Sequence, residues 1–355
     1  MKVHLTEQGN SMMSSDCSCA RASVPAARWA GLLGAACFAL TPLQGALAQS
    51  AQGYPAKPVR IIIPSAPGGP SDTNGRGVAQ ALSEALGQPF VVDNRPGADG
   101  IIGAEACVRS APDGYTLCTC DGQGFSLNPV IRAKMPYDPL RDLSPVIQTA
   151  FLNSALVIHP SVPANSVSEL LDLAKTKPGL ITYGTSGLAS VANIYVQWLK
   201  KAKGVEFQGV PYKGITQAFK GLVAGEVQVA NFAVGQVAQY IKAGKIKALG
   251  QTGETRSRHL PDVPTFKEAG MGIALRNWFG LFAPAGTPRD IVQRLNAEVS
   301  RNLLNNPVLQ ERFLISQGLS AESPVGESPE AFAAFLKADR EYFATVIKAT
   351  GIRLD

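Results

Sequence analysis

The sequence contains few of the residues from which metal centres and many catalytic sites are built. It has six cysteines and three histidines among 355 residues, and only His159 and His259 lie beyond residue 48. No Cys-x-x-Cys pair occurs after residue 48. Zinc sites need several such ligands at short spacings, so none is expected. We expect neither a metal nor a cofactor.

Blocks of like charge are also missing. The formal net charge is +6, of which residues 1–48 supply +1 through three basic and two acidic residues, leaving +5 for the rest. No run of Lys and Arg concentrates this charge, whereas nucleic-acid-binding proteins usually present a clustered basic face. Nucleic acid is therefore not an expected partner.

The first 48 residues have the organisation of an export signal. Lys2, Arg21 and Arg28 precede an apolar run over residues 29–40, and Ala46-Leu47-Ala48 supplies a small-x-small cleavage site. A membrane-spanning helix is the competing interpretation, but the run is shorter than the ~20 residues a span requires. We predict cleavage after Ala48 and export.

Two further alternatives concern this leader. The pair Met12-Met13 could be the true start, and Cys37 could carry a lipid anchor, although the preceding leucine lies one position too early for that motif. Removal of residues 1–48 leaves 307, which suits two domains of ~150 residues.

Three cysteines remain after residue 48, namely Cys107, Cys118 and Cys120. Cys118 and Cys120 are two apart in a predicted strand, so they share one face and rarely have disulfide geometry with each other. We expect all three to be small buried residues. A bridge from Cys107 to either member of the pair is the alternative.

Short β-branched segments alternate with amphipathic helical segments, which is typical of helices packed on a mostly parallel sheet. The predicted strands cover residues 59–63, 90–92, 116–120, 180–183, 207–210, 227–231 and 246–250, and predicted helices include 187–202, 215–224 and 235–243. In the 187–202 helix we expect one apolar stripe to be core: Val191, Ile194, Tyr195, Trp198 and Leu199.

Several helix ends carry capping signals. Ser166 and Glu169 form a capping box, in which each side chain accepts a hydrogen bond from a free backbone N–H. Thr287-Pro288 and Ser328-Pro329 each place a capping hydroxyl before a proline at the first helical position. Gly351 is a predicted C-terminal stop.

The Gly/Pro-rich turn over residues 64–72 lies between a predicted strand and a predicted helix. Free N–H groups and the helix dipole at such a turn can hold a carboxylate or phosphate without a cationic side chain. Ser71 and Asp72 are both competent N-caps, and capping alone is the competing interpretation. We expect Asp72 to orient the turn and cap the helix rather than contact an anion, because two carboxylates repel.

Two other strand-to-helix edges resemble this turn, over residues 122–127 and 183–190. Neither the first turn nor these edges match a nucleotide motif: no Gly-Lys-Ser/Thr follows Gly69, and residues 122–127 lack the third glycine of a dinucleotide fingerprint. We expect the three edges to converge on one crevice.

Ser186 is the only serine placed like a nucleophile, at a strand-to-helix turn. The nucleophile elbow is Gly-x-Ser-x-Gly, whereas here Gly187 follows directly and Leu188 replaces the second glycine. A general base is also required, and we predict His159 and His259 to be solvated turn residues. We therefore expect no enzyme activity, and an exported serine hydrolase stays the alternative.

A series of short motifs runs in order through nearly the whole chain beyond residue 48. They include Tyr54-Pro55, Ala66-Pro67-Gly68-Gly69 with Asp72, Asn94-Arg95-Pro96-Gly97, residues 112–117, residues 136–139, residues 210–214, residues 260–265 and residues 278–288. In this order, they resemble the substrate-binding receptors of tripartite tricarboxylate transporters, the Bug-type periplasmic proteins.

The resemblance implies a two-lobed α/β fold of the Venus-flytrap type, each lobe a mixed, mostly parallel sheet flanked by helices. Residues 54–150 with 282–355 would form lobe 1, and residues 151–281 lobe 2. Such a periplasmic protein, expected to be a monomer, would hold a small carboxylate between the lobes through amides, hydroxyls and waters. It would deliver this solute to membrane permease subunits or, alternatively, signal to a membrane sensor.

The positions that match the family's pocket are Ser65, Pro67, Gly68, Gly69, Ser71, Asp72, Phe125, Ser126, Thr185, Ser186, Ser190, Lys213, Gly214 and Asn231. Lys213 is the one cation we expect near the cleft, with a solvated turn lysine as the alternative. Near the cleft, the residue type departs from the family pattern at five positions, of which Ser65 is also a pocket position: Ser65, Asp99, Ile101, Ile215 and Gln228. The identity of the carboxylate therefore does not follow from the resemblance.

Overall fold

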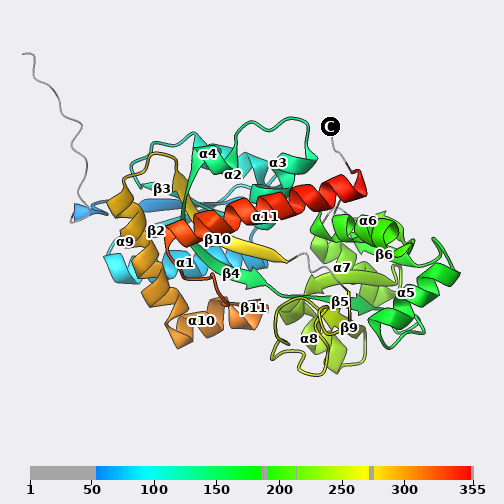
Figure 1. Cartoon of the computed structure of the whole chain (residues 1–355). Coiled ribbons are helices and arrows are strands. Elements are labelled where there is room, and N and C mark those ends of the chain that lie inside the picture. The colour runs from blue at the N-terminus through cyan, green and yellow to red at the C-terminus, as the bar shows by residue number, and fades with distance from the viewer. Residues whose placement is uncertain (1–52, 186, 188–189, 213, 272–275, 353–355) are drawn as a thin grey trace, which may run out of the picture. The chain divides into compact units, whose positions relative to one another are not determined.

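The computed structural model describes residues 53–185, 187, 190–212, 214–271 and 276–352, so the predicted leader lies outside the described residues. Figure 1 shows two β-sheets flanked by helices. The strands are β1 Val59–Ile63, β2 Phe90–Asn94, β3 Thr116–Asp121, β4 Leu143–Leu152, β5 Ser154–Ile158, β6 Thr182–Thr185, β7 Gln208–Pro211, β8 Val229–Ala233, β9 Lys247–Gln251, β10 Asn277–Pro284 and β11 Leu319–Ser320.

Helices and single helical turns connect these strands. They are α1 Pro70–Leu86, η2 Ala98–Gly100, α2 Ile101–Val108, η3 Gln123–Leu127, α3 Asn128–Ile131, α4 Pro139–Asp142, α5 Val167–Thr176, α6 Val191–Lys203, α7 Ile215–Ala224, α8 Val234–Lys242, α9 Arg289–Val299, η4 Ser300–Leu304, α10 Pro307–Phe313, η5 Ile315–Gln317 and α11 Pro329–Thr350. Among the described helices, none has the length and hydropathy needed to cross a bilayer.

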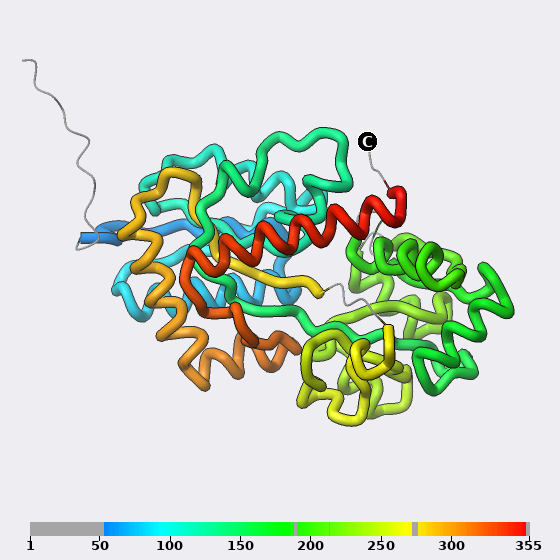
Figure 2. Tube along the Cα trace, viewed as in Figure 1, coloured from blue at the N-terminus to red at the C-terminus, as the bar shows by residue number. Residues whose placement is uncertain are grey.

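The strand order is β11-β4-β10-β3-β1-β2 in the first sheet and β7-β6-β8-β5-β9 in the second. Strands β1, β2 and β3 pair in parallel, as do β6, β7 and β8, whereas β4, β5, β9 and β10 pair antiparallel to their neighbours. The antiparallel strands carry the chain from one sheet to the other and back (Figure 2). Two mixed sheets flanked by helices confirm the predicted fold class.

The central strands of both sheets are buried on both faces, which explains their continuous apolar sequences, whereas the edge strand β7 is largely exposed. In β1, Ile61 and Ile63 join one core cluster, whereas Ile62 joins the cluster on the opposite face. Helix α11 contributes Phe332 and Leu336 to the core of the first sheet. Its last turns place Phe343, Val346 and Ile347 in the core of the second sheet, near α6 (Figure 1).

The predicted lobe boundaries at 150/151 and 281/282 fall inside β4 and β10, two strands of the first sheet. The division of residues between the lobes stays a prediction.

Most predicted helix starts agree with the structure. Ser166 Oγ accepts a hydrogen bond from Glu169 N at 3.1 Å, while Glu169 Oε2 accepts one from Asn165 N at 2.8 Å. Ser328 caps α11 by accepting from Ala331 N at 3.2 Å, and the helix ends at Gly351 with a positive φ of 73°.

The starts predicted at Thr287 and at residue 187 were wrong. Helix α9 begins at Arg289 with Pro288 at the cap position and no side-chain cap, whereas the hydroxyl of Thr287 donates to Pro284 O at 2.8 Å. Helix α6 begins at Val191 rather than residue 187, because Ser190 has extended dihedrals and caps the helix.

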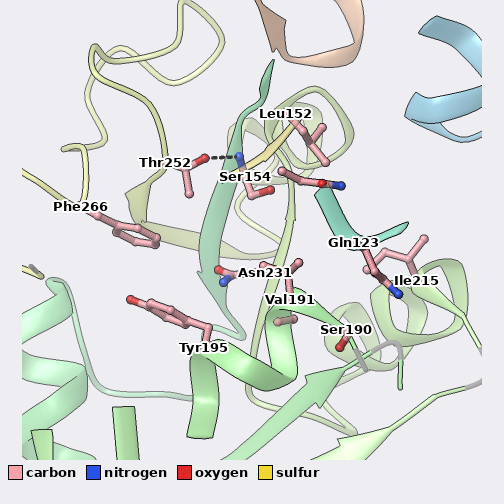
Figure 3. A pocket seen from close by; sticks show the side chains of 12 residues that line it. Gln123, Leu152, Ser154, Ser190, Val191, Tyr195, Ile215, Asn231, Thr252 and Phe266 are labelled. Atoms are coloured by element: carbon pink, nitrogen blue, oxygen red, sulfur yellow. Dashed lines mark hydrogen bonds between the residues drawn. The ribbon is translucent and has the colours of Figure 1, made fainter. Parts of the chain in front are cut away.

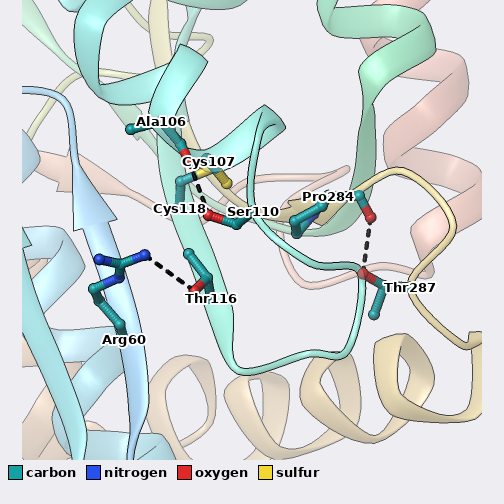
Figure 4. The surroundings of a disulfide bond; sticks show 8 residues. All are labelled: Arg60, Ala106, Cys107, Ser110, Thr116, Cys118, Pro284 and Thr287. Atoms are coloured by element: carbon teal, nitrogen blue, oxygen red, sulfur yellow. Dashed lines mark hydrogen bonds between the residues drawn. A yellow bond between two sulfur atoms is a disulfide. The ribbon is translucent and has the colours of Figure 1, made fainter. Parts of the chain in front are cut away.

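Cys107 and Cys118 form a disulfide between α2 and β3 (Figure 4), with Cα atoms 6.0 Å apart. The expectation of three unpaired cysteines was therefore wrong, and the alternative with a bridge is the one observed. Cys120 is free and buried. Because Cys118 and Cys120 share one face of β3, only the placement of α2 decides which of them Cys107 meets.

Candidate functional site

A cavity of about 150 Å³ lies where elements of the two sheets meet, beside the crossover from β4 to β5 (Figure 3). Gln123 and Asn277 line it from η3 and β10 of the first sheet, and the other side comes from the second sheet and its helices. The described lining residues are Gln123, Leu152, Ser154, Ser190, Val191, Ala192, Tyr195, Ile215, Asn231, Thr252, Phe266 and Asn277.

The β4–β5 crossover separates this cavity from a second one. Leu152 and Ser154 line the first, whereas Asn153 lines a cavity of about 360 Å³. This alternation follows from extended backbone, in which successive side chains point to opposite faces. Ser154 N donates to Thr252 Oγ1 at 2.8 Å, and Thr252 N donates to Ser154 O at 2.8 Å. These two bonds hold the outgoing and returning segments together at the cavity.

The amino terminus of α6 opens into the cavity. Its cap residue Ser190 accepts from Asn193 N at 3.2 Å and donates its hydroxyl proton to Gly187 O at 2.7 Å. Ser190, Val191 and Ala192 line the cavity. The first N–H groups of a helix and its dipole give this end a partial positive charge, so this wall of the cavity favours an anion.

Neutral polar groups make up much of the remaining lining. The Oδ1 atom of Asn231 and the hydroxyl of Tyr195 are buried without a hydrogen-bond partner among the described residues. Burial raises the pKa of Tyr195, whose ring stacks on Phe266 with centroids 5.8 Å apart. A neutral tyrosine hydroxyl can donate or accept a hydrogen bond, so this region suits a polar organic solute.

The predicted core stripe of α6 is confirmed, since Tyr195 is also a core residue and Val191 and Trp198 pack against the same core. Ile194 and Leu199 are core residues as expected. Val191 and Tyr195, one helical turn apart, also border the cavity. A single face of a helix can thus serve both core and cavity, and apolar periodicity does not distinguish the two.

The β1–α1 turn is organised by Asp72. Helix α1 begins at Pro70 with Gly69 as a cap that has no side-chain hydrogen bond, so the expectation that Ser71 or Asp72 is the N-cap was wrong. Asp72 reaches back instead, accepting from Gly68 N at 2.9 Å, Arg76 Nε at 2.9 Å and Asn94 Nδ2 at 2.8 Å. Burial opposes ionisation, but the hydrogen bonds outweigh it and lower the pKa of Asp72.

The structure brings few of the predicted ligand-binding residues together at the cavity. Ser190 and Asn231 line it. Phe125 lies in the core of the first sheet, with its ring stacked on Phe282 and edge-on to Trp278, and Ser126 is buried beside it. Residues not among the described lining are Ser65, Pro67, Gly68, Gly69, Ser71, Asp72, Thr185 and Gly214. Ser186 and Lys213 lie outside the described residues, and ligand contact by any of these residues stays a prediction.

Several lining residues carried no signal that would have marked them in the sequence. Ser154, Thr252 and Asn277 come from the segments in which the chain passes between the sheets, and no local pattern distinguishes them from other polar strand-end residues. Gln123 could have been identified from the sequence, because it belongs to the Gly-containing edge over residues 122–127.

The carboxylate of Asp121 is partly buried, next to the first-sheet residues that line the cavity. Asp121 Oδ1 accepts from Gly124 N at 2.8 Å, and Asp121 Oδ2 accepts from Asn277 Nδ2 at 3.5 Å. The Oδ1 atom of Asn277 in turn accepts from Gly122 N at 2.9 Å. Gly122 N and the longer contact to Asp121 together orient the Asn277 amide that lines the cavity. Burial raises the pKa of Asp121, and Asp99 adds to the shift.

This shift predicts how stability depends on pH in the variant Asp121→Asn. A carboxyl whose pKa is raised on folding destabilises the native state once the pH exceeds its unfolded value of about 4. The variant removes this penalty, so its unfolding temperature should exceed that of the parent at pH 7, and the difference should shrink below about pH 4. Thermal unfolding by circular dichroism at both pH values measures the difference; a pH-independent difference would contradict the assignment.

Comparison with known proteins agrees with this architecture. The family model of the tripartite tricarboxylate transporter family receptors matches residues 75–352. Protein BugT of Bordetella pertussis is 33% identical over 311 residues, covering 86% of this chain and 93% of the relative. Two solved structures are similar throughout. R. palustris Rpa4515 with adipate is 32% identical, with a TM-score of 0.76 and coverage of 84% of this chain and 99% of its own.

The second is MatC from Rhodopseudomonas palustris with bound malate, which is 30% identical with a TM-score of 0.73 and covers 83% of this chain and 100% of its own. The family model spans most of the chain. The two sheets described above form the two lobes of a single fold. The chain is therefore a member of the tripartite tricarboxylate transporter receptor family, the Bug-type periplasmic solute-binding proteins.

Proposed function

We propose that the protein captures a small carboxylate in the cavity between its two lobes and delivers it to the membrane permease of a tripartite tricarboxylate-type transporter. The observation that carries this proposal is the amino terminus of α6, which opens into an interlobe cavity lined by neutral hydrogen-bonding side chains. A helix amino terminus can bind a carboxylate without a cationic side chain.

The relatives support the chemical class of the solute. One is seen with adipate and another with malate, and both ligands are carboxylates. The family description supports transport as the output. We further propose that residues 1–48 direct export and that the remainder acts in the periplasm as a binding protein rather than an enzyme.

The direct test is thermal unfolding in the presence of a panel of mono-, di- and tricarboxylates. A ligand that binds only the native state stabilises it by about 2.7 kcal/mol at a hundredfold excess over its Kd. We expect at least one member of the panel to raise the unfolding temperature. A panel without effect on the purified protein would contradict the proposal.

Two serine caps supply a matched pair of variants. Ser190 and Ser328 cap α6 and α11 with the same geometry, each accepting from the N–H three residues on at 3.2 Å. Replacement by alanine should cost about 1 kcal/mol of stability at either position. Only Ser190→Ala should also weaken carboxylate binding, because only Ser190 lines the cavity. Equal affinity in the two variants would place the ligand elsewhere.

A further inference from the structure

Asp121 is an acidic residue next to the cavity. Carboxylate binding at the amino terminus of α6 does not require it. Its side chain accepts hydrogen bonds from Gly124 N and from the Asn277 amide, and Asn277 lines the cavity. Asp121 forms no ion pair with any residue that the structure describes. An unpaired carboxylate at low exposure is energetically unfavourable, so a carboxylate at the wall of a ligand cavity indicates a role there.

The groups around Asp121 do not neutralise it. Asp99 of η2 is close enough to raise its pKa, but Asp99 itself is ion-paired with Arg132. The Cys120 thiol and the Tyr137 hydroxyl lie near it as well, and their pKa values are raised mainly by burial, with a further contribution from Asp121. Neither of these groups carries a positive charge. Above the raised pKa of Asp121, its negative charge has no neighbouring cation to screen it and acts across Asn277 on whatever occupies the cavity.

The cavity is consequently polarised. On the second-sheet side, the amino terminus of α6 offers a partial positive charge at Ser190 and Ala192. On the first-sheet side, the carboxyl group of Asp121 lies next to Asn277, at 3.5 Å from its amide nitrogen, and is negative once the pH exceeds its raised pKa. A ligand carboxylate is therefore stabilised near the amino terminus of α6 and repelled near Asp121.

We propose that Asp121 determines the specificity of the site, so that it selects small carboxylates whose other end is neutral or cationic and disfavours dicarboxylates. This inference rests on the proposed function, since it concerns the far end of the same ligand. The expected preference differs from the ligands seen with two relatives, adipate and malate. Amino carboxylates are the class with the best charge complementarity.

The test compares ligands that differ only in the charge of one end. Adipate, hexanoate and 6-aminohexanoate share a six-carbon skeleton, and succinate, butanoate and 4-aminobutanoate provide the same series with four carbons. Isothermal titration calorimetry of the parent protein should rank the aminocarboxylate tightest and the dicarboxylate weakest within the series that fits the cavity. The expected separation is on the order of tenfold, as for like charges several ångströms apart in a partly buried site.

The variant Asp121→Asn should reverse the preference, raising the affinity for the dicarboxylate and lowering that for the aminocarboxylate. Asp93→Asn is the matched control, because Asp93 is paired with Arg95 on the edge strand β2 and should leave the ranking unchanged. Unfolding curves of both variants verify that each is folded.

The possible outcomes separate the two proposals. A parent protein that binds the dicarboxylate as tightly as its analogues, or a ranking that Asp121→Asn does not alter, would overturn the role of Asp121 and leave carboxylate capture intact. Absence of binding by all six compounds and by the wider carboxylate panel would contradict the proposed function, and the specificity proposal with it.

Discussion

Replacing Cys107 and Cys118 together with alanine is expected to lower the free energy of unfolding by about 3 kcal/mol. The two cysteines are 11 residues apart in sequence, and a crosslink closing a loop of roughly this size stabilises a protein by about 3 kcal/mol, chiefly by restricting the unfolded chain. Urea unfolding followed by circular dichroism measures the difference.

Two controls isolate the crosslink from the loss of buried sulfur. Cys120→Ala removes a buried thiol from the same core without breaking a bridge, so its effect should be clearly smaller. The parent protein under reducing conditions should approach the double variant. A double variant within 1 kcal/mol of the oxidised parent (roughly a third of the loop-closure value) would show that the bridge adds little stability.

The second large effect is expected at Arg276, which lies where the chain re-enters the first sheet. Its guanidinium donates to Glu322 Oε2 at 2.5 Å, Asn153 Oδ1 at 2.9 Å and Ser320 Oγ at 2.5 Å. It also stacks over the Phe151 ring at 4.0 Å. Burial lowers the pKa of Arg276, although the Glu322 carboxylate opposes the shift. This one side chain joins both crossover segments to β11.

Arg276→Met should therefore cost about 3 kcal/mol, because it leaves Glu322 and two polar groups without their buried partner. Adding Glu322→Gln should recover part of the loss by removing the unpaired charge. The control is Arg289→Met, which breaks the exposed ion pair with Glu330 and should cost less than about 1 kcal/mol. Chemical unfolding measures the stability of the parent, the two single arginine variants and the double variant. Equal losses of unfolding free energy in Arg276→Met and Arg289→Met would show that burial at Arg276 is unimportant.

Local structure was predictable wherever a local signal determined it. The sequence predicted β1 over residues 59–63 and α7 over residues 215–224, and both have those bounds in the structure. The apolar runs are buried because exposure to water is unfavourable for them. The serine caps at Ser166 and Ser328 accept hydrogen bonds from N–H groups within the same turn. Thr287 is not a cap because α9 begins two residues later, at Arg289, with Pro288 at the cap position.

The fold class followed from alternation of strands and helices, and the ordered motifs indicated the family. These inferences use information that lies in short windows, in which each residue's partners are neighbours in the chain. Hydrophobic periodicity also identified α6 as a packed helix, although it could not show that Val191 and Tyr195 face a cavity as well.

Only the tertiary structure decided the features that depend on distant partners. Cys118 and Cys120 are equivalent in sequence, and the packing of α2 on β3 selects Cys118. Ser154, Thr252, Asn231 and Asn277 meet at one cavity because the chain crosses between the sheets and returns. Asp121 is next to that cavity because β10 pairs with β3 and brings Asn277 beside it. A sequence specifies the chemistry of such residues, but their proximity arises from the order of strands in the sheets.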